Sequence, residues 1–585
     1  MKKKINLINL QIDSKIEKKF DNYNLKNLIS IGDWCELANN IYLKKKKFKY
    51  LDFYDWYNLK KKSKDTVVII NTYEYFLKFF TKKLNQIHKE NKSVRFWEIL
   101  LSRWLFTYVV NIFSRWQIVN KIKSKYKINS VLSKKIKTRN LIPYTSQHFH
   151  WIMQSPYDDD WNTIIFNRII KFIFKKQIKF ITFENKKKIK NKNNIFKKIS
   201  YSNVINLSIY KKIFFYDFSL NRKLKLLMMF ENLFLNIQLK KKNIYLDSKI
   251  NHHMREKLNL EKNNSKNNFY KFIHLDLKNS LPKIFLEDYS LLKKTYKNLN
   301  WPKKPEYILS SYGQYYDEVF KFYCAQKIDN TKFFILQHGY NNMFADKDFY
   351  AGNIDKKIST NFLTWGKNLK DNSKPFIFPL KSHFEDKINS NKKIIFILYA
   401  FNEKPYLPLN GFISNNQKNV KTIKLVENFI KNSSLEIQNN SSAKLMSHSS
   451  IESVNKSIKY KFPNLVFVNP KKKFSQIINN FNLSIHFFLG TPFFESMHHN
   501  KPCVLILDKE IHLNFDRKFS IFLNDLKKNK ICFEKVDDAS KFINLNYDNI
   551  SKWWKNKRLQ KSRNKFCEVY CRNFENNKEI LKKLF

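Results

Sequence analysis

The chain has 585 residues, of which 43% are hydrophobic, so it is long and apolar enough to form two or more domains with packed cores. It contains no run of 18 apolar residues, and charged side chains interrupt the first 20 positions, which argues against a membrane-spanning helix and a signal peptide and predicts a cytoplasmic protein. The formal net charge of +61 comes from 99 lysines and 11 arginines spread over every segment, as biased codon usage would produce, and this dispersal argues against a focused nucleic-acid-binding surface.

A long amphipathic helix is predicted over residues 97–116. Apolar side chains from Trp97 to Trp116 recur at the spacing that places them on one helix face. Glu98 and Arg103 lie on other faces, which favours burial against protein over insertion into lipid. Peripheral association with the inner membrane stays open as an alternative.

An acidic run, Asp158-Asp159-Asp160, precedes a second predicted helix at residues 161–174. Adjacent carboxylates can hold a divalent cation. Negative charge at a helix N-terminus is also stabilising without any metal, and we favour that interpretation. The six cysteines lack the spacing of a zinc site and suit a reducing compartment. We therefore expect no metal cofactor.

From about residue 305, short apolar runs alternate with helical segments. This alternation predicts parallel sheets that are covered by helices on both faces. The expected strands are residues 307–309, 333–336, 362–365, 394–398, 465–468, 483–489 and 503–507. Two such sheets in series, joined near residues 367–385, would enclose a cleft. The predicted domains are residues 1–366 with helical insertions, 380–548 with a Rossmann-like sheet, and 549–585 as a helical segment.

The first candidate site is the motif Gln337-His338-Gly339, which follows the predicted strand at 333–336. Ligands bind at the carboxyl ends of parallel strands, so His338 is placed to meet one. An imidazole with an ordinary pKa of about 6.5 could remove a proton from a hydroxyl group or bind a departing phosphate. A histidine that is merely hydrogen-bonded within its loop is the alternative.

The second candidate site follows the predicted strand that ends before Gly490. Thr491 is expected to cap a helix with Pro492 at its first position. Free N–H groups at such a helix start favour phosphate. Glu495 lies one turn further and could accept hydrogen bonds from ribose hydroxyls. An ordinary capped helix would have the same sequence pattern.

Further polar residues are candidates because they lie beside these motifs or at a strand end. Lys444 and His448 could face a diphosphate, although charged residues near loops often only meet water. Ser496 follows the second motif directly. Glu318 and Lys321 have the spacing of an ion pair within a helix, which we favour over a site.

Short motifs that matter in combination run along nearly the whole chain. They are Gly32-Asp33-Trp34-Cys35, Arg95-Phe96-Trp97, Arg115-Trp116, Asp159-Asp160-Trp161-Asn162, Gln337-His338-Gly339, Trp365-Gly366, residues 495–502 and Trp553-Trp554. Together they resemble a family of bacterial transferases that are encoded in lipopolysaccharide and capsule gene clusters. That family is distantly related to the CDP-glycerol glycerophosphotransferases.

The resemblance implies an α/β fold of the GT-B type, with two Rossmann-like domains facing a cleft, helical N-terminal elaborations and a C-terminal helical segment. The implied activity moves a sugar or alditol-phosphate group from a nucleotide-activated donor to a surface-polysaccharide acceptor, either a glycan or a lipid-linked glycan. His338 would be the catalytic base or a phosphate partner. The implied donor-binding residues are Gln337, Gly339, Lys444, His448, Gly490, Thr491, Glu495 and Ser496. Positioning and preorganised charge can support such chemistry without a metal.

The sequence departs from its relatives next to both candidate sites. Tyr340-Asn341-Asn342 stands where relatives carry further glycines and an acidic-His-acidic cluster, and Gly490-Thr491-Pro492 stands where relatives often carry two hydroxyl residues. A non-catalytic transferase-like protein that binds a glycan or a partner enzyme is therefore one alternative, and a basic nucleic-acid-binding protein is another. A catalytic role requires His338 and the helix start near Thr491 to face each other.

Overall fold

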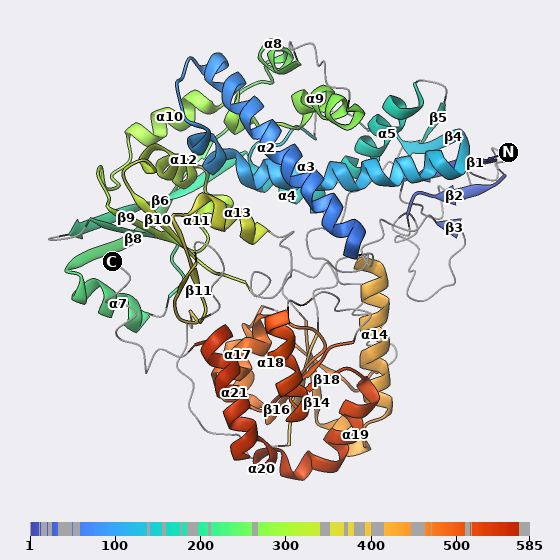
Figure 1. Ribbon diagram of the computed structural model, residues 1–585, viewed down its shortest axis with the longest axis vertical. Helices are drawn as coiled ribbons and strands as arrows, with labels where there is room; N and C mark the ends of the chain where they lie inside the picture. The colour runs from blue at the N-terminus through green and yellow to red at the C-terminus, as the bar shows by residue number, and fades with distance from the viewer. Residues whose placement is uncertain are drawn as a thin grey trace.

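The computed structural model of the protein describes residues 2–10, 12, 20, 26–32, 35, 49–50, 59–136, 141–154, 160–175, 178–183, 197–208, 212–220, 222–259, 267–339, 351–367, 373–379, 392–398, 415–445, 462–469, 471–508, 515 and 517–572. Figure 1 shows two lobes, with the N-terminal half above and residues 392–572, in orange and red, below. Within these residues lie three parallel sheets and one antiparallel ribbon.

The N-terminal sheet is an element that the sequence did not predict. Its spatial order is β3 (Lys49–Tyr50), β2 (Leu28–Ser30), β1 (Lys3–Asn9), β4 (Tyr126–Lys134) and β5 (Lys179–Phe183), and all its strands are parallel. The region around this sheet contains α2 (Leu59–His88), α3 (Val94–Lys125), α4 (Ser146–Gln154) and α5 (Asp160–Phe174). Lysine and asparagine interrupt the strands, which weakens the alternation that marks a strand in sequence. The second predicted helix, at 161–174, is confirmed as α5.

Helix α3 is the long amphipathic helix that the sequence predicts, but it is buried on more than one face. It begins after Ser93, whose hydroxyl accepts a hydrogen bond from the Phe96 amide. Arg115 is fully buried, and its guanidinium donates to Asn162 Oδ1 at 2.8 Å and to Asn111 Oδ1 at 2.9 Å. The helix also contacts α2, α5, α12 and α13. It is therefore a central support of the upper lobe and is not available to a membrane.

The middle sheet contains three of the predicted strands in chain order. Its spatial order is β7 (Ile213–Tyr216), β9 (Tyr307–Ser310), β10 (Lys332–Leu336), β11 (Asn361–Thr364) and β12 (Ser373–Pro375), all parallel. The helices of this region are α7 (Arg222–Glu231), α8 (His252–Glu256), α9 (Asn268–Ser280), α10 (Tyr289–Lys297), α11 (Gly313–Tyr316), α12 (Glu318–Lys327) and α13 (Ala351–Ile358). In α12 the expected ion pair is confirmed, with Lys321 Nζ 2.6 Å from Glu318 Oε2 and both side chains buried.

The C-terminal sheet has the strand order of a Rossmann fold. Its order is β15 (Val466–Val468), β14 (Ser441–Lys444), β13 (Ile394–Ile397), β16 (Leu483–His486), β17 (Cys503–Ile506) and β18 (Cys532–Phe533), all parallel. From β13 the chain adds strands on one side of the sheet up to β15, and from β16 it adds them on the other side. Sheets of this kind bind ligands at the point between β13 and β16 where the strand order reverses. Its helices are α14 (Asn415–Lys431), α15 (Leu435–Asn439), α17 (Thr491–His498), α18 (Arg517–Lys528) and α19 (Val536–Asn546).

A C-terminal helical segment follows the last sheet, as the sequence predicts, with α20 (Ile550–Trp554) and α21 (Lys557–Tyr570). The end of α21 returns to the middle sheet, where the Arg572 amide donates to Trp365 O at 2.7 Å. A side chain at Gly366 would place its Cβ 2.4 Å from Val569 O, so only glycine permits this approach. The fold is α/β and GT-B-like, with Rossmann strand order in both the N-terminal and the C-terminal sheets, and the middle sheet lies between them in the chain.

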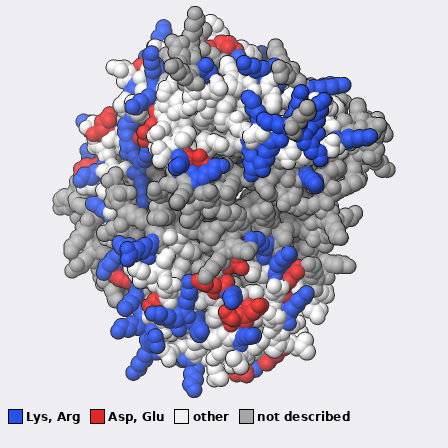
Figure 2. Space-filling view, turned by 45° about the vertical axis from the view of Figure 1, so that its right-hand side comes forward, with Lys and Arg blue, Asp and Glu red and all other residues white. Residues whose placement is uncertain are grey.

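The described residues also bear on membrane contact and charge. No helix within them is both long and apolar enough to span a membrane. All six cysteines are buried thiols that form no disulfide. Figure 2 shows lysine and arginine side chains over both lobes of one face, with a group of acidic side chains in the lower lobe. On this face, positive charge is not confined to one lobe.

Candidate functional site

Two turns at the carboxyl ends of β10 and β16 carry the candidate residues. The motif Gln337-His338-Gly339 follows β10 directly. Residues 487–490 connect β16 to α17. Both turns therefore lie where open α/β sheets bind ligands.

Gln337 fixes the first turn. Its side-chain nitrogen donates to Gly339 O at 2.8 Å, and its Oε1 accepts a hydrogen bond from the Trp365 amide at 3.1 Å. Trp365 Nε1 also donates to Gln337 O at 2.6 Å. Gln337 is almost fully buried, a position that does not favour the predicted contact with a donor. Among the described residues, a Cβ at Gly339 would have no neighbour within 4 Å.

The His338 ring lies among aromatic and acidic side chains. Its centroid is 4.3 Å from that of Tyr315 in an edge-on contact and 5.1 Å from that of Tyr312. Its Nδ1 is 4.0 Å from Asp355 Oδ2, and the Tyr315 hydroxyl donates to the same carboxylate oxygen. About a fifth of the side chain, 21%, is exposed. The arrangement of a histidine with a carboxylate behind it is one that can orient an imidazole for proton transfer.

The pKa of His338 differs from the ordinary value that the sequence suggested. Burial, together with the neighbouring Arg103 cation, lowers the pKa of His338 to about 3. Burial raises the pKa of Asp355 to about 7. His338 is therefore neutral at physiological pH and has a free lone pair. An ionised Asp355 would stabilise the imidazolium that forms when His338 takes a proton.

Arg103 is a member of this cluster that the sequence did not single out as a site residue. It projects from α3, and its guanidinium carbon lies 4.1 Å from the Tyr315 ring centroid. Asp355 comes from α13, so three separate elements supply the residues around His338. The only sequence signal for Arg103 was the scarcity of arginine in a lysine-rich chain.

The second turn differs from the prediction by one residue. Gly490 is the N-cap of α17, where Thr491 was expected, and no side chain caps the helix. Thr491 and Pro492 occupy the first turn. A Cβ at Gly490 would lie 2.1 Å from the Phe488 ring, so the packing of that ring requires glycine here. The helix start consequently has no side-chain acceptor of its own.

Glu495 and Lys444 come together beside this helix start. Burial raises the pKa of Glu495 to about 7, and the positive charges of Lys444 and Lys473 oppose that rise. Glu495 Oε2 is buried without a hydrogen-bond partner among the described residues. Lys444 Nζ donates to Lys472 O at 2.6 Å, and burial lowers the pKa of this lysine. Glu495 and Lys444, which were both predicted to bind the donor, therefore interact electrostatically with each other.

Ser496 faces the protein interior. It is fully buried, and its hydroxyl lies 3.1 Å from Ser484 Oγ and 3.3 Å from His486 Nε2. Burial lowers the pKa of His486 to about 3. This buried position does not favour the predicted contact between Ser496 and a donor. His448, the other predicted residue, lies outside the described residues.

The two turns lie next to each other in space. Trp365, which is bonded to Gln337, has its ring centroid 6.2 Å from that of Phe494 in α17. Side chains of the middle sheet, α17 and α21 also share one hydrophobic core. His338 and the start of α17 therefore belong to one region between the lobes.

A sequence profile of one transferase family matches residues 11–585 of the chain. The chain belongs to the LIC12162 family of transferases. No curated protein matches the sequence.

Several solved structures share a weak likeness with this family member. HepE of Anabaena, in complex with UDP and glucose, is 9% identical, with 54% of this chain and 88% of that chain covered and a TM-score of 0.31. MurG of Acinetobacter baumannii is 11% identical, with 51% and 77% covered and a TM-score of 0.27. The wall teichoic acid polymerase TagF is 10% identical, with 50% and 82% covered and a TM-score of 0.28.

The acidic run of this family member is described only at Asp160. Lys134 Nζ forms an ion pair with Asp160 Oδ1 at the start of α5. The described ranges contain no group of three or more His, Cys, Asp or Glu side chains that could hold a metal. Metal independence stays a prediction.

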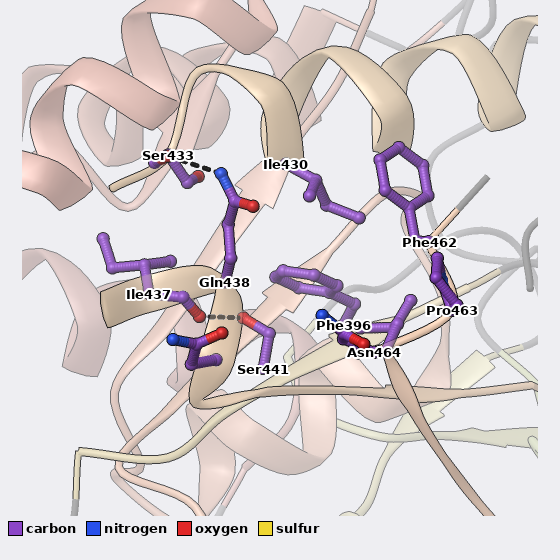
Figure 3. Close-up of a pocket in the computed structure, with 11 residues that line it drawn as sticks. Phe396, Ile430, Ser433, Ile437, Gln438, Ser441, Phe462, Pro463 and Asn464 are labelled. Carbon is purple, nitrogen blue, oxygen red and sulfur yellow. Dashed lines mark hydrogen bonds between the residues drawn. The ribbon is translucent and has the colours of Figure 1, made fainter. Parts of the chain in front are cut away.

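A pocket of 230 Å³ lies at the other end of the C-terminal sheet (Figure 3). Phe396 and Phe462 line it, and Ser441, the first residue of β14, donates to Ile437 O at 2.6 Å at its edge. Lys444 marks the opposite end of the same strand. The pocket is therefore at the amino edge of the sheet and is separate from the candidate site.

Proposed function

We propose that the protein transfers a sugar or alditol-phosphate group from a nucleotide-activated donor to a hydroxyl group of a surface-polysaccharide acceptor. One observation carries the proposal. The neutral His338 at the edge of the middle sheet and the uncapped start of α17 at the edge of a Rossmann-ordered sheet lie in one region, joined by the contact of Trp365 with Phe494 and by a shared hydrophobic core. Proton transfer and phosphate binding can therefore act on the same substrate pair.

The C-terminal sheet is suited to hold the donor. Its reversal point lies between β13 and β16, and backbone N–H groups at a helix start bind phosphate. Lys444 adds a positive charge there. Glu495, with one oxygen that lacks a partner, would accept hydrogen bonds from the ribose hydroxyls.

The middle sheet is suited to activate the acceptor. The acceptor oxygen would form a bond to the transferred group while its proton passes to His338 and the bond to the departing nucleotide breaks. Asp355, 4.0 Å from Nδ1, would hold the resulting imidazolium in place. The nucleotide would leave toward Lys444 and the start of α17.

A thermal-shift screen tests donor binding. The ligands are CMP, UMP, UDP, GDP and their activated sugars or alditols. A ligand at 100 times its dissociation constant should add about 2.7 kcal/mol of apparent stability. We expect one nucleotide class to raise the melting temperature, and Lys444→Met to reduce that rise. Lys552→Met, at an exposed position in α20, is the matched control.

Absence of a shift with every nucleotide, together with absence of donor turnover, would contradict the proposal. Glycan binding under those conditions would favour the non-catalytic alternative. Tight DNA or RNA binding with a steep salt dependence would favour the nucleic-acid-binding alternative.

We also propose that the protein associates peripherally with an anionic membrane through the ribbon of β6 (Lys198–Ser208) and β8 (Phe234–Tyr245), which lies at the left of the upper lobe in Figure 1. One face of this ribbon is apolar and exposed. It consists of Ile205 (43% exposed), Leu207 (64%), Leu235 (38%), Ile237 (45%) and Leu239 (42%). The intervening Asn236 is buried instead. Exposed apolar patches of this kind mark interaction surfaces.

The charges next to the ribbon favour lipid over a second copy of the chain. Lys240, Lys241 and Lys242 continue β8 and are all exposed. A symmetric dimer through this face would bring two such clusters together, whereas anionic lipid would neutralise them.

Vesicle co-sedimentation tests the membrane proposal. We expect binding to vesicles that contain 30% phosphatidylserine and weak binding to phosphatidylcholine alone. Each lysine near the surface contributes about 1 kcal/mol, so replacing Lys240, Lys241 and Lys242 by Gln should weaken binding by about 10²-fold. Equal binding by this variant, or a dimer in solution that is lost on Leu207→Ser, would contradict a lipid occupant.

A further inference from the structure

Arg103 is half-buried, and it differs from the fully buried arginines of the described residues. Arg115 has its donors bonded to Asn111 and Asn162, and Arg255 forms a bidentate pair with Glu287 at 2.6 and 2.8 Å. Arg103 Nε and Nη1 are buried without a hydrogen-bond partner among the described residues. Its guanidinium carbon lies over the Tyr315 ring, 4.1 Å from the ring centroid.

The groups around Arg103 supply only part of a compensating negative charge. Burial raises the pKa of Asp355 to about 7 against the opposing effect of the Arg103 cation, and this carboxyl group already accepts the Tyr315 hydroxyl. Burial and then the Arg103 cation lower the pKa of His150 and of His338, so both rings are neutral. Two buried donors without acceptors destabilise the folded state. Unsatisfied donors of this kind are expected at sites where a ligand supplies the missing acceptors.

We propose that Arg103 binds a phosphate group of a substrate beside His338. This inference rests on the proposed function and names the chemistry of that site more closely. A guanidinium presents a planar fork of donors that matches a phosphate oxygen pair, and its stacking on Tyr315 fixes that fork. The bound phosphate would accept from one fork, either Nε with Nη2 or Nη1 with Nη2, and so satisfy one of the two unmet donors. It would also neutralise the cation that lowers the basicity of His338.

The phosphate could belong to the donor or to the acceptor. Arg103 lies on the His338 side, whereas Lys444 and the start of α17 form the other side of the region. The arrangement favours an acceptor whose reacting hydroxyl is close to a phosphodiester or diphosphate. A donor phosphate that reaches across to Arg103 is the second source, and the experiment separates the two.

The test compares Arg103→Met and Arg103→Lys with Arg95→Met, a control on the same helix whose guanidinium is paired with Glu98 at 3.0 Å. Inorganic pyrophosphate is the probe, titrated by calorimetry with and without a saturating nucleotide. We expect Arg103→Met to lower pyrophosphate affinity about 10-fold to 100-fold, since hydrogen bonds to charged groups have that strength. Arg103→Lys should retain part of the affinity, and Arg95→Met all of it.

The melting temperature of the ligand-free protein separates binding from structural support. Methionine can cover Tyr315 without leaving unmet donors, so Arg103→Met should melt at the same temperature as the parent or slightly higher. A structural arginine would instead lower the melting temperature when removed. Reduced melting temperature with unchanged pyrophosphate affinity would overturn the proposal.

Nucleotide binding identifies the source of the phosphate. If Arg103→Met weakens pyrophosphate binding but leaves the activated donor unaffected, the acceptor supplies the phosphate. If the activated donor is weakened by the same factor, the donor supplies it. Arg103-dependent pyrophosphate binding in a protein that binds no nucleotide would reject the proposed function and retain the anion site.

Discussion

The two sides of the candidate site are built in different ways. On the C-terminal sheet, one continuous segment from β16 through α17 supplies Gly490, Thr491 and Glu495. On the middle sheet, β10 supplies His338, while α3 and α13 supply Arg103 and Asp355. Only Lys444, at the end of β14, joins the C-terminal side from elsewhere in the chain. A side made mostly from one segment can be recognised as a motif, whereas a side made from three segments exists only in the folded chain.

The two sides also differ in the chemistry they offer. The C-terminal side has an uncapped helix start and a lysine, which suit phosphate. The middle side has a neutral histidine next to a carboxyl group, which suits proton transfer. The comparison predicts that substitutions on the middle side lower turnover, and that substitutions on the C-terminal side lower donor affinity and local stability.

The largest effect is expected at His338. His338→Ala should lower turnover by about 10² to 10⁴, because the acceptor hydroxyl loses its proton acceptor. The affinity for the nucleotide should stay within about twofold, since the donor is held on the other side. Steady-state kinetics and nucleotide titration measure the two quantities. His253→Ala, at an exposed histidine of α8, is the control.

An unchanged turnover in His338→Ala would remove this residue from the mechanism. A loss of nucleotide affinity equal to the loss of turnover would show that the two sides are not divided in function.

An effect of intermediate size is expected at Gly490. In Gly490→Ala the new Cβ would lie 2.1 Å from the Phe488 ring, and the overpacked helix start should cost about 1 to 3 kcal/mol of stability and weaken nucleotide binding. Gly339→Ala is the matched change on the middle side, where a Cβ meets nothing within 4 Å. It should change stability by less than about 0.5 kcal/mol. Chemical denaturation compares the two, and equal losses would contradict the packing account.

The smallest effect is a pH-dependent one at Asp355. The folded pKa of about 7 lies above the unfolded pKa of about 3.9, so the native state holds a proton that the unfolded state has released between these values. Stability therefore falls as pH rises through this window. Asp355→Asn removes the titration and should raise the melting temperature by about 2 to 5 °C at pH 8.

The same variant should show a smaller gain over the parent at pH 4.5, because most of the window between the two pKa values lies above that pH. A gain at pH 4.5 that equals the gain at pH 8 would mean that Asp355 is ionised throughout.

The sequence predicted much of the two later sheets, because their central strands are short apolar runs between helices. Residues 333–336 and 503–507 are examples, and both became buried strands. β14, with the sequence Ser-Ser-Ala-Lys, is too polar to stand among the apolar runs, although the sequence placed Lys444 at a strand end, and β13 and β15 pair with this strand on either side. The N-terminal sheet was missed for a related reason, since Lys3 and Lys4 open β1 with exposed charges.

The sequence predicted the C-terminal side of the site better than the middle side. It placed Gly490, Thr491 and Glu495 at a helix start, with an error of one residue in the cap. It identified His338 but neither Asp355 nor Arg103, because a partner that comes from another helix leaves no pattern around the histidine. It also expected an ordinary pKa for His338, since burial cannot be read from a turn motif.

Hydrogen exchange with mass spectrometry tests the central claim most directly, namely that one ligand is held between the two turns. The measurement compares the ligand-free protein with the protein saturated by the activated donor that the screen identifies. We predict slower exchange in peptides that cover residues 333–339 and in those that cover 488–496 at the same ligand concentration. Protection confined to the pocket residues 430–441 and 462–465, or to one of the two turns alone, would contradict the account.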